Sequence, residues 1–324
     1  MNTAAVDDAC PGQPALDVLT IGESMVLLVA DEPGPLCQVS HFSKRLAGAD
    51  SNVAIGLARL GFKVGWLSRL GADSFGDHVR SAIGSEGVDI SQVITDSERL
   101  TGMMLKSRAV GGANPVTEYY RRGSAASALS SADLKRGYML AARHYHATGI
   151  SPALSPEVHA LVQGTMRDMR AAGRTVSFDP NLRPALWPSE AVMRTRLLEL
   201  AQHADWVLPG IDEGRLLTGH AEPHDMAGYF LERGAQAVVV KLGVKGAYYR
   251  TVGEQGVVPA APVAEVVDTV GAGDGFAVGL LSARLEGRTW RDAVARGNWI
   301  AAQAIQVIGD MEGLPRRDAL PRGL

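Results

Sequence analysis

The segment Asp-Thr-Val-Gly-Ala-Gly-Asp at residues 268–274 sets two glycines and an acid where a strand is predicted to meet a helix. The apolar run 263–267 before it predicts the strand, and apolar residues at helical spacing follow from Phe276. Small residues let a backbone approach a ligand closely, and the unpaired first amides of a helix favour an anion. A carboxylate there, Asp274, is suited to take a proton from a hydroxyl that receives a phosphoryl group.

The alternative for this segment is an ordinary glycine-rich turn with an acid at the start of a helix. A dinucleotide-binding fingerprint fits less well, because the spacing is Gly-x-Gly-x-Gly and the segment lies late in the chain. No glycine loop is followed by Gly-Lys-Ser/Thr, and the protein-kinase signatures are absent. If the segment binds phosphate, the chain is therefore neither a P-loop enzyme nor a protein kinase.

Strand and helix patterns alternate through most of the chain. Strands are predicted at residues 17–21, 64–67, 144–148, 175–178, 206–208 and 237–241, and helices at 51–60, 75–83, 156–172 and 290–308. This alternation predicts an α/β fold with a mostly parallel sheet that helices cover on both faces. Ligands are expected at the carboxyl ends of the strands.

Two regions, residues 25–46 and 102–122, lack helical periodicity and carry β-branched or alternating runs. We interpret them as strands of a small second sheet, a lid that excludes water from phosphoryl transfer. The alternative is a pair of surface hairpins with no role. One face of the lid would carry Val26, Leu28, Met103 and Leu105. So small a sheet is marginal alone, so we expect two lids to pack together in a homodimer, with larger assemblies left open.

Composition narrows the class of protein. The 324 residues, 46% hydrophobic and 21% charged, suffice for one large α/β domain or two smaller ones. A net charge of −3 gives no general basic field for nucleic acid. Two cysteines, Cys10 and Cys37, are too few for a disulfide framework, which favours a reducing cytoplasm. No apolar run predicts a membrane span, and residues 1–14 resemble a short tail more than a signal peptide.

Two further clusters carry polar side chains beside small residues or strand ends. Residues 47–52 contain Asp50 and Asn52, which could hydrogen-bond a polyhydroxyl compound, although both residue types also favour helix N-caps. Residues 179–183 follow a predicted strand, and Arg183 could pair with a carboxylate through two hydrogen bonds. The alternative for the second cluster is a turn held by its Asp and Asn side chains.

Two more clusters lie on the lid and after a late strand. In residues 119–122, alternation puts Tyr120 and Arg122 on one face, where they could bind an acidic sugar, or else form a solvated edge. In residues 241–247, glycines would let adenine or its phosphates lie close.

His144 and His146 share one face of a predicted strand and could bind zinc. They lie in mid-chain, and no companion cluster of metal ligands stands out. We therefore interpret this pair as structural.

Together, these motifs resemble, in order and context, the ribokinase-like sugar kinases, also called phosphofructokinase-B-like carbohydrate kinases, from about Asp17 to Gly313. The resemblance implies a three-layer α/β/α fold and an ATP-dependent sugar kinase. It makes Asp274 the base and assigns the anion hole to the amides of Gly271, Ala272 and Gly273. It places Lys241, Gly243, Gly246 and Asn298 at the nucleotide.

Within that family, three local features resemble kinases of 2-keto-3-deoxygluconate, a sugar acid. They imply substrate contacts from the lid residues Tyr120 and Arg122, from Arg183 and from Asp310 in the segment 309–313. Gly48 and Asn52 complete the expected substrate site. Two positions depart from the pattern. Of a frequent Asn-x-x-Glu near the magnesium site only Glu213 remains, and Met104 replaces a tyrosine.

The sequence therefore predicts one kinase domain over residues 15–313, with tails at 1–14 and 314–324. The predicted reaction is ATP-dependent phosphorylation of the terminal hydroxyl of 2-keto-3-deoxygluconate with Mg²⁺, and a monovalent cation such as K⁺ is left open. A kinase of a neutral sugar such as fructose or ribose is the alternative enzyme. A non-catalytic sugar or nucleotide sensor is the alternative from another class, and the intact base and anion hole argue against it.

Overall fold

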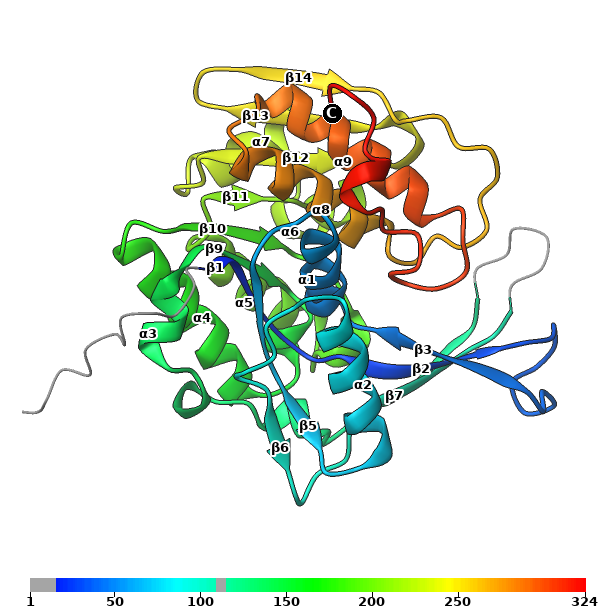
Figure 1. Ribbon diagram of the computed structural model, residues 1–324. Helices are drawn as coiled ribbons and strands as arrows, with labels where there is room; N and C mark the ends of the chain where they lie inside the picture. Colours follow the sequence, from blue (N-terminus) through cyan, green and yellow to red (C-terminus); the bar gives the residue numbers. More distant parts are fainter. Residues whose placement is uncertain (1–15, 109–114) are drawn as a thin grey trace, which may run out of the picture.

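A computed structural model describes residues 16–108 and 115–324 of the chain. Its central sheet runs in the order β14-β13-β12-β11-β10-β9-β1-β4 (Figure 1). These strands are β1 Leu16–Ile21, β4 Val64–Leu67, β9 Ala142–Thr148, β10 Thr175–Asp179, β11 Trp206–Val207, β12 Ala237–Lys241, β13 Ala247–Thr251 and β14 Gln255–Val258. Neighbours from β12 to β4 pair in parallel, whereas β13 and β14 are antiparallel. The predicted mostly parallel sheet is confirmed.

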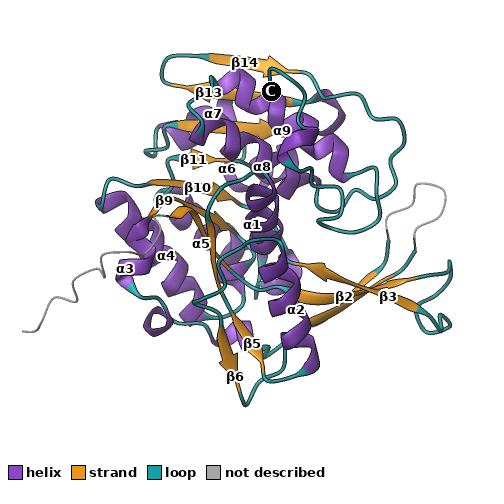
Figure 2. Ribbon diagram, viewed as in Figure 1, coloured by secondary structure: helices purple, strands orange, loops and turns teal. Residues whose placement is uncertain are grey.

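Helices cover both faces of this sheet (Figure 2). One face is covered by α1 Ala49–Arg59, α2 Ser74–Ser85, α8 Ala272–Leu285 and α9 Trp290–Ala304. The other is covered by α3 Arg136–Ala141, α4 Pro156–Ala171, α5 Glu190–Ala201, α6 Ile211–Thr218 and α7 Pro223–Leu231. Short 3-10 turns lie at Ala125–Ala128, Ser131–Asp133, Ser151–Ala153, Pro184–Leu186, Gly243–Lys245 and Arg317–Ala319. Each layer has its own core, around Trp66 on the first face and Phe178 on the second. The three-layer α/β/α fold is therefore confirmed.

A second sheet projects from the body as the predicted lid (Figure 1). It has the order β3-β2-β7-β8, formed by β2 Met25–Ala30, β3 Phe42–Ala47, β7 Met103–Lys106 and β8 Thr117–Tyr120. A parallel pair, β5 Arg69–Gly71 and β6 Ile94–Asp96, lies beside α2. Part of the predicted lid segment, the predicted tail at 1–14 and Cys10 lie outside the described residues.

The two faces of the lid have different surroundings. Met25, Leu27, Val29, Ala47 and Met104 form a small buried cluster on one face, and Ile308 packs against it. On the other face, Leu28, Met103 and Leu105 are half-buried. Val26 was expected beside them for a partner lid, but its side chain is already fully buried in the chain's own core.

The predicted strand at residues 263–267 is wrong. The segment is an irregular loop, with the amides of Val267 and Asp268 bonded to the carbonyl of Ile305 at 2.8 and 3.2 Å. Val263 and Val266 line a cavity instead of joining a sheet, because the edge strand β14 has already ended at Val258. The same carbonyl marks the end of α9, four residues earlier than predicted.

The residues after 313 also differ from the predicted tail. Leu314 is buried, and its carbonyl accepts a hydrogen bond from Arg59 at 2.9 Å. Leu320 packs on the core, and Arg317 pairs with Glu286. The packed body therefore extends past the predicted boundary. Within residues 16–108 and 115–324, no helix is both long and apolar enough to cross a membrane.

Candidate active site

Helix α8 begins at a backbone position that only glycine adopts easily. Gly271, its N-cap, has φ +83°, and an added Cβ would clash with the carbonyl oxygen of Asp310. Ala272 and Gly273 follow in the first turn, where amides lack partners within the helix. These amides and the helix dipole favour an anion at this point.

Asp274 stands in that first turn with its carboxylate buried. Asn52 on α1 donates a hydrogen bond from Nδ2 to Asp274 Oδ2 at 2.8 Å. Desolvation raises the pKa of Asp274 to about 7, with Asp179 and Asp310 adding to the rise and the Asn52 hydrogen bond opposing it. A carboxylate with a pKa near neutrality is well matched to general-base catalysis.

A cavity of about 600 Å³, here called the acidic cavity, opens in front of Asp274. Segments far apart in sequence converge on it, as the Asn52 contact already shows. Of the predicted site residues, it is lined by Gly48, Asn52, Arg183, Glu213, Lys241, Gly243, Gly271, Gly273, Asp274 and Asp310. At Gly48 an added Cβ would lie 2.5 Å from the carbonyl oxygen of Glu23, so a side chain there would disturb the cavity wall.

Asp50 brings a second buried carboxylate to the acidic cavity. Its Oδ2 accepts hydrogen bonds from Thr148 and Ser151 at 3.2 and 2.6 Å, whereas its Oδ1 has no partner among the described residues. Desolvation raises the pKa of Asp50 to about 7 despite those hydrogen bonds. An unpartnered buried oxygen at a cavity wall is a ready acceptor for a ligand hydroxyl.

Lys241 stands between Asp179 and the start of α8. Its Nζ lies 2.5 Å from Asp179 Oδ2, and an added Cβ on Gly273 would lie 3.6 Å from the same nitrogen. Burial alone would lower the pKa of Lys241, but the charges of Asp179, Glu213 and Asp274 outweigh it and raise that pKa. Lys241 therefore remains an ammonium group beside the anion hole.

A second cavity, of about 620 Å³ and here called the apolar cavity, lies on the other side of Lys241. Its walls include Val244, Val263, Phe276 and Ile305, together with the predicted residues Lys241, Gly243, Gly246, Ala272, Gly273 and Asn298. Asn298 holds the wall by donating to the carbonyls of Val258 and Pro259 at 3.0 and 2.9 Å. The two cavities share Lys241, Gly243, Thr269 and Gly273, so they meet at the N-terminus of α8.

Tyr120 and Arg122 were expected to face the substrate, but neither lines the acidic cavity; the residue before each of them does. The acidic cavity is lined instead by Tyr119, which lies opposite Met104 in the register, and by Arg121, which directly follows β8. Tyr120 and Arg122 line a third cavity, of about 900 Å³ and here called the outer cavity, whose lining also includes Tyr119 and Arg121. The Arg121 guanidinium is buried and lies 2.5 Å from Glu23 Oε2.

Glu213, the residue predicted at a metal, uses both carboxylate oxygens on backbone amides. Oε2 accepts from Gly210 at 2.6 Å, and Oε1 accepts from Leu182 at 2.9 Å. This carboxylate therefore joins the start of α6 to the loop that carries Arg183. Its role at a metal stays a prediction.

The two histidines of β9 are buried and contact neighbouring side chains of the sheet. His144 and His146 each lie within hydrogen-bond distance of Ser177 Oγ, at 2.7 and 2.8 Å, and His144 stacks on Trp206. Desolvation lowers the pKa of both imidazoles to about 3. These contacts support the structural interpretation of the pair.

The sequence reasoning missed Lys106, which the lid buries beside Asp268 and Asp310. The only local signal was a lysine that ends the apolar strand Met-Met-Leu-Lys. Tyr119 and Arg121 were also missed as residues of the acidic cavity.

Comparison with known proteins decides the family. The profile of the pfkB family carbohydrate kinases matches residues 15–317. This chain belongs to the pfkB family. The protein is therefore a carbohydrate kinase, as the resemblance predicted.

Individual relatives agree with this family. Over 306 residues this pfkB kinase is 51% identical to a 2-dehydro-3-deoxygluconokinase of Bacillus subtilis (strain 168), and the match covers 94% of each chain. A crystal structure of a PfkB protein from Polaromonas sp. JS666 is 51% identical with a TM-score of 0.87, covering 94% of this chain and 98% of that one. A putative ribokinase II from E. coli, solved with ATP and Mg²⁺, is 30% identical with a TM-score of 0.85, covering 94% and 97%.

Proposed function

We propose that this enzyme transfers the γ-phosphoryl group of ATP to the terminal hydroxyl of 2-keto-3-deoxygluconate, which is also named 2-dehydro-3-deoxygluconate. One observation carries the proposal: the acidic and apolar cavities meet at the N-terminus of α8, with the Asp274 carboxylate on the acidic side. The name of the Bacillus subtilis relative supports the choice of sugar acid.

Each part of the junction has a chemical role. Asp274 takes the proton of the sugar hydroxyl as its oxygen forms the bond to the γ-phosphorus, and the bond from that phosphorus to the ADP oxygen breaks. The amides of Gly271, Ala272 and Gly273 stabilise charge on the transferring group. Lys241 adds a positive charge at the point where the two cavities join. The apolar cavity suits the adenine ring.

A magnesium ion fits the oxygen chemistry of the junction. Among the described residues, no group of three or more His, Cys, Asp or Glu side chains could hold a metal by itself. Mg²⁺ needs only one or two carboxylates when nucleotide phosphates and water complete its shell. Glu213 and the exposed Asp212 line the acidic cavity and would hold it there. When bound, the ion would neutralise phosphate charge.

Recognition of an acid sugar follows from the guanidinium groups of the acidic cavity. Arg121 is already paired with Glu23. Arg183 is exposed at the cavity wall, and within the described part of the chain it makes no ion pair. Arg183 is therefore the group that would pair with the substrate carboxylate. Tyr119, Asp50 and Asp310 line the same cavity and would bind the sugar hydroxyls.

The test is a coupled assay of ADP release over acid and neutral sugars. We expect 2-keto-3-deoxygluconate to give the highest kcat/KM, and preference for fructose or ribose would overturn the substrate assignment. Arg183→Gln should raise KM for the acid sugar by about tenfold or more, since a charge-assisted pair is worth about 1.5–3 kcal/mol. Arg122→Gln, which alters the outer cavity, is the matched control and should leave that KM within about twofold. Sugar binding without turnover would instead support the sensor.

Two further proposals concern assembly and location. We propose a homodimer in which two lids pack together through the faces that carry Met103 and Leu105, since both side chains are only half-buried. We also propose that the enzyme acts in the cytoplasm, because its reaction consumes ATP.

A further inference from the structure

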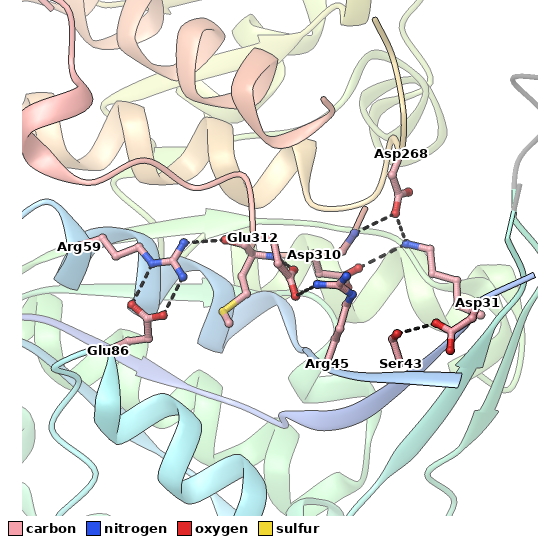
Figure 3. A network of polar contacts seen from close by, with 11 residues as sticks. Asp31, Ser43, Arg45, Arg59, Glu86, Asp268, Asp310 and Glu312 are labelled. Carbon is pink, nitrogen blue, oxygen red and sulfur yellow. Dashed lines mark hydrogen bonds and ion pairs between the residues drawn. The ribbon is translucent and has the colours of Figure 1, made fainter. Parts of the chain in front are cut away.

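Lys106 gives the lid a buried positive charge that the proposed reaction does not use. Its side chain is 2% exposed, and Nζ lies 2.5 Å from Asp268 Oδ2 and 3.5 Å from Asp310 Oδ1. Asp268 and Asp310 belong to two separate segments that approach each other above the lid strands (Figure 3). A desolvated ammonium group needs such partners, so these pairs fix the lid against both segments.

Both acids are joined to the catalytic backbone. Asp268 Oδ1 accepts a hydrogen bond from the amide of Val270 at 3.1 Å, immediately before the anion hole. Asp310 lines the acidic cavity, and Gly271 packs so closely on its carbonyl that no side chain would fit between them. A displacement of either carboxylate would therefore also displace the backbone at the N-terminus of α8.

The segment that carries Asp310 is held from two sides. Arg59 of α1 donates to the carbonyls of Met311 and Leu314 at 2.8 and 2.9 Å, and these contacts do not involve the lid. From the lid, Arg45 of β3 pairs with Glu312 at 2.9 Å, with side chains 31% and 24% exposed (Figure 3). Among the described residues, two ion pairs join the lid to this segment, and the pair made by Lys106 is the more deeply buried.

We propose that Lys106 is a positioning residue that couples closure of the lid to the placement of Asp310 and of the Gly271–Gly273 amides. With the lid closed, the ammonium group orders Asp310 beside the sugar and Asp268 next to the anion hole. With the lid open, Asp268 and Asp310 lose their shared partner, so the site is complete only in the closed state. The effect on sugar binding rests on the proposed function, whereas the coupling of the segments does not.

Hydrogen exchange of the ligand-free protein tests the coupling without any substrate. In Lys106→Met, the amides of β2 and β7 and those of residues 268–271 and 309–312 should all exchange faster than in the wild type. Lys44→Met, the same change at an exposed lysine of β3, is the control and should leave residues 268–271 and 309–312 unchanged. Faster exchange in the lid alone, or in neither place, would overturn the proposal.

Kinetics test the positioning role on the sugar that the wild type phosphorylates. Lys106→Met should raise KM for that sugar about tenfold or more, whereas Kd for a non-hydrolysable ATP analogue should stay within about twofold. Lys106→Arg, which keeps the charge, should recover most of the lost affinity.

If Lys106→Met does not fold, the charge-balanced double variant Lys106→Met/Asp268→Asn replaces it with the same expected rise in KM. A folded variant whose KM equals that of the wild type would contradict the proposal. A wild type that prefers a neutral sugar would contradict only the proposed substrate, and the same variants would then be measured on that sugar.

Discussion

Asp274 combines two features that a general base requires. Burial keeps its pKa near neutrality, and the Asn52 amide holds the carboxylate in one orientation while favouring its ionised form. Because the base must be ionised to accept a proton, its active fraction falls about tenfold for each pH unit below its pKa. We therefore expect kcat/KM to decline on the acid side of about pH 7.

Asn52→Leu tests the origin of that pH dependence. Removing the amide donor should raise the pKa of Asp274, because the ionised form loses its hydrogen bond while the desolvation remains. The acid limb of kcat/KM should move about one unit toward alkaline pH, since a hydrogen bond to a charged group is worth about 1.5–3 kcal/mol. Ser51→Ala is the control, because its hydroxyl contacts Ser24 and Gly48 instead.

The comparison of the two pH profiles isolates Asp274. Desolvation raises the pKa of Asp50 to about 7 and that of Asp310 to about 6, but both residues are present in both proteins. An acid limb at the same pH in Asn52→Leu and the wild type would show that Asn52 does not tune the base.

Local motifs identified single residues well where the backbone itself determined their position. Gly271 and Asp274 were predictable because a helix N-terminus imposes its own geometry. The face of β8 was not, because a slip of one residue reverses every side chain of a strand, and only the pairing with β7 sets it. Lys106 was missed because its partner Asp268 lies 162 positions away.

The helices α8 and α9 pack with their backbones in close contact at Gly279. At Gly279 an added Cβ would lie 2.5 Å from the carbonyl oxygen of Arg296 and 2.6 Å from the Cα of Gly297. These are backbone atoms, so no rotamer change can relieve the contact. The fixed spacing of the two helices holds the first turn of α8 at the junction of the cavities.

Gly279→Ala should therefore lower the free energy of unfolding by about 1–3 kcal/mol, because overpacking outweighs the better helix propensity of alanine. The control is Gly164→Ala in α4, where an added Cβ meets no atom within 4 Å. That variant should be more stable by about 0.5–1 kcal/mol. Urea denaturation measures both, and equal effects of the two substitutions would refute the packing argument.

Elements with strong periodicity were predictable, and the predicted β12 at Ala237–Lys241 coincides with the observed strand. The loop at 263–267 was not, because β-branched residues also line cavities, and sequence does not show whether a partner strand is available. The C-terminal residues were misjudged because Leu314 finds its packing partners on α1 and α8, more than thirty positions earlier.

At the scale of the whole molecule, the four-stranded lid contributes residues to the wall of the acidic cavity. One face of the lid packs within the chain, whereas on the other face Met103 and Leu105 remain half-buried beside the 54% exposed Tyr120. A second lid would cover that face and stabilise the sheet.

Light scattering at micromolar concentration should therefore give the mass of a dimer. Leu105→Glu should yield monomers by setting a charge in the interface, whereas Val192→Glu, on the exposed surface of α5, should not. A wild-type monomer with full activity would show that the lid needs no partner.

The role of Asp274 at the junction of the two cavities is the central claim, and turnover of Asp274→Asn tests it most directly. The substitution keeps the shape and the Asn52 neighbour but removes the base, so kcat should fall about 10²- to 10⁴-fold. Binding of a non-hydrolysable ATP analogue, measured by calorimetry, should stay within about threefold, because the apolar cavity is untouched. A variant that keeps a kcat close to the wild-type value would contradict the assignment of Asp274 as the base.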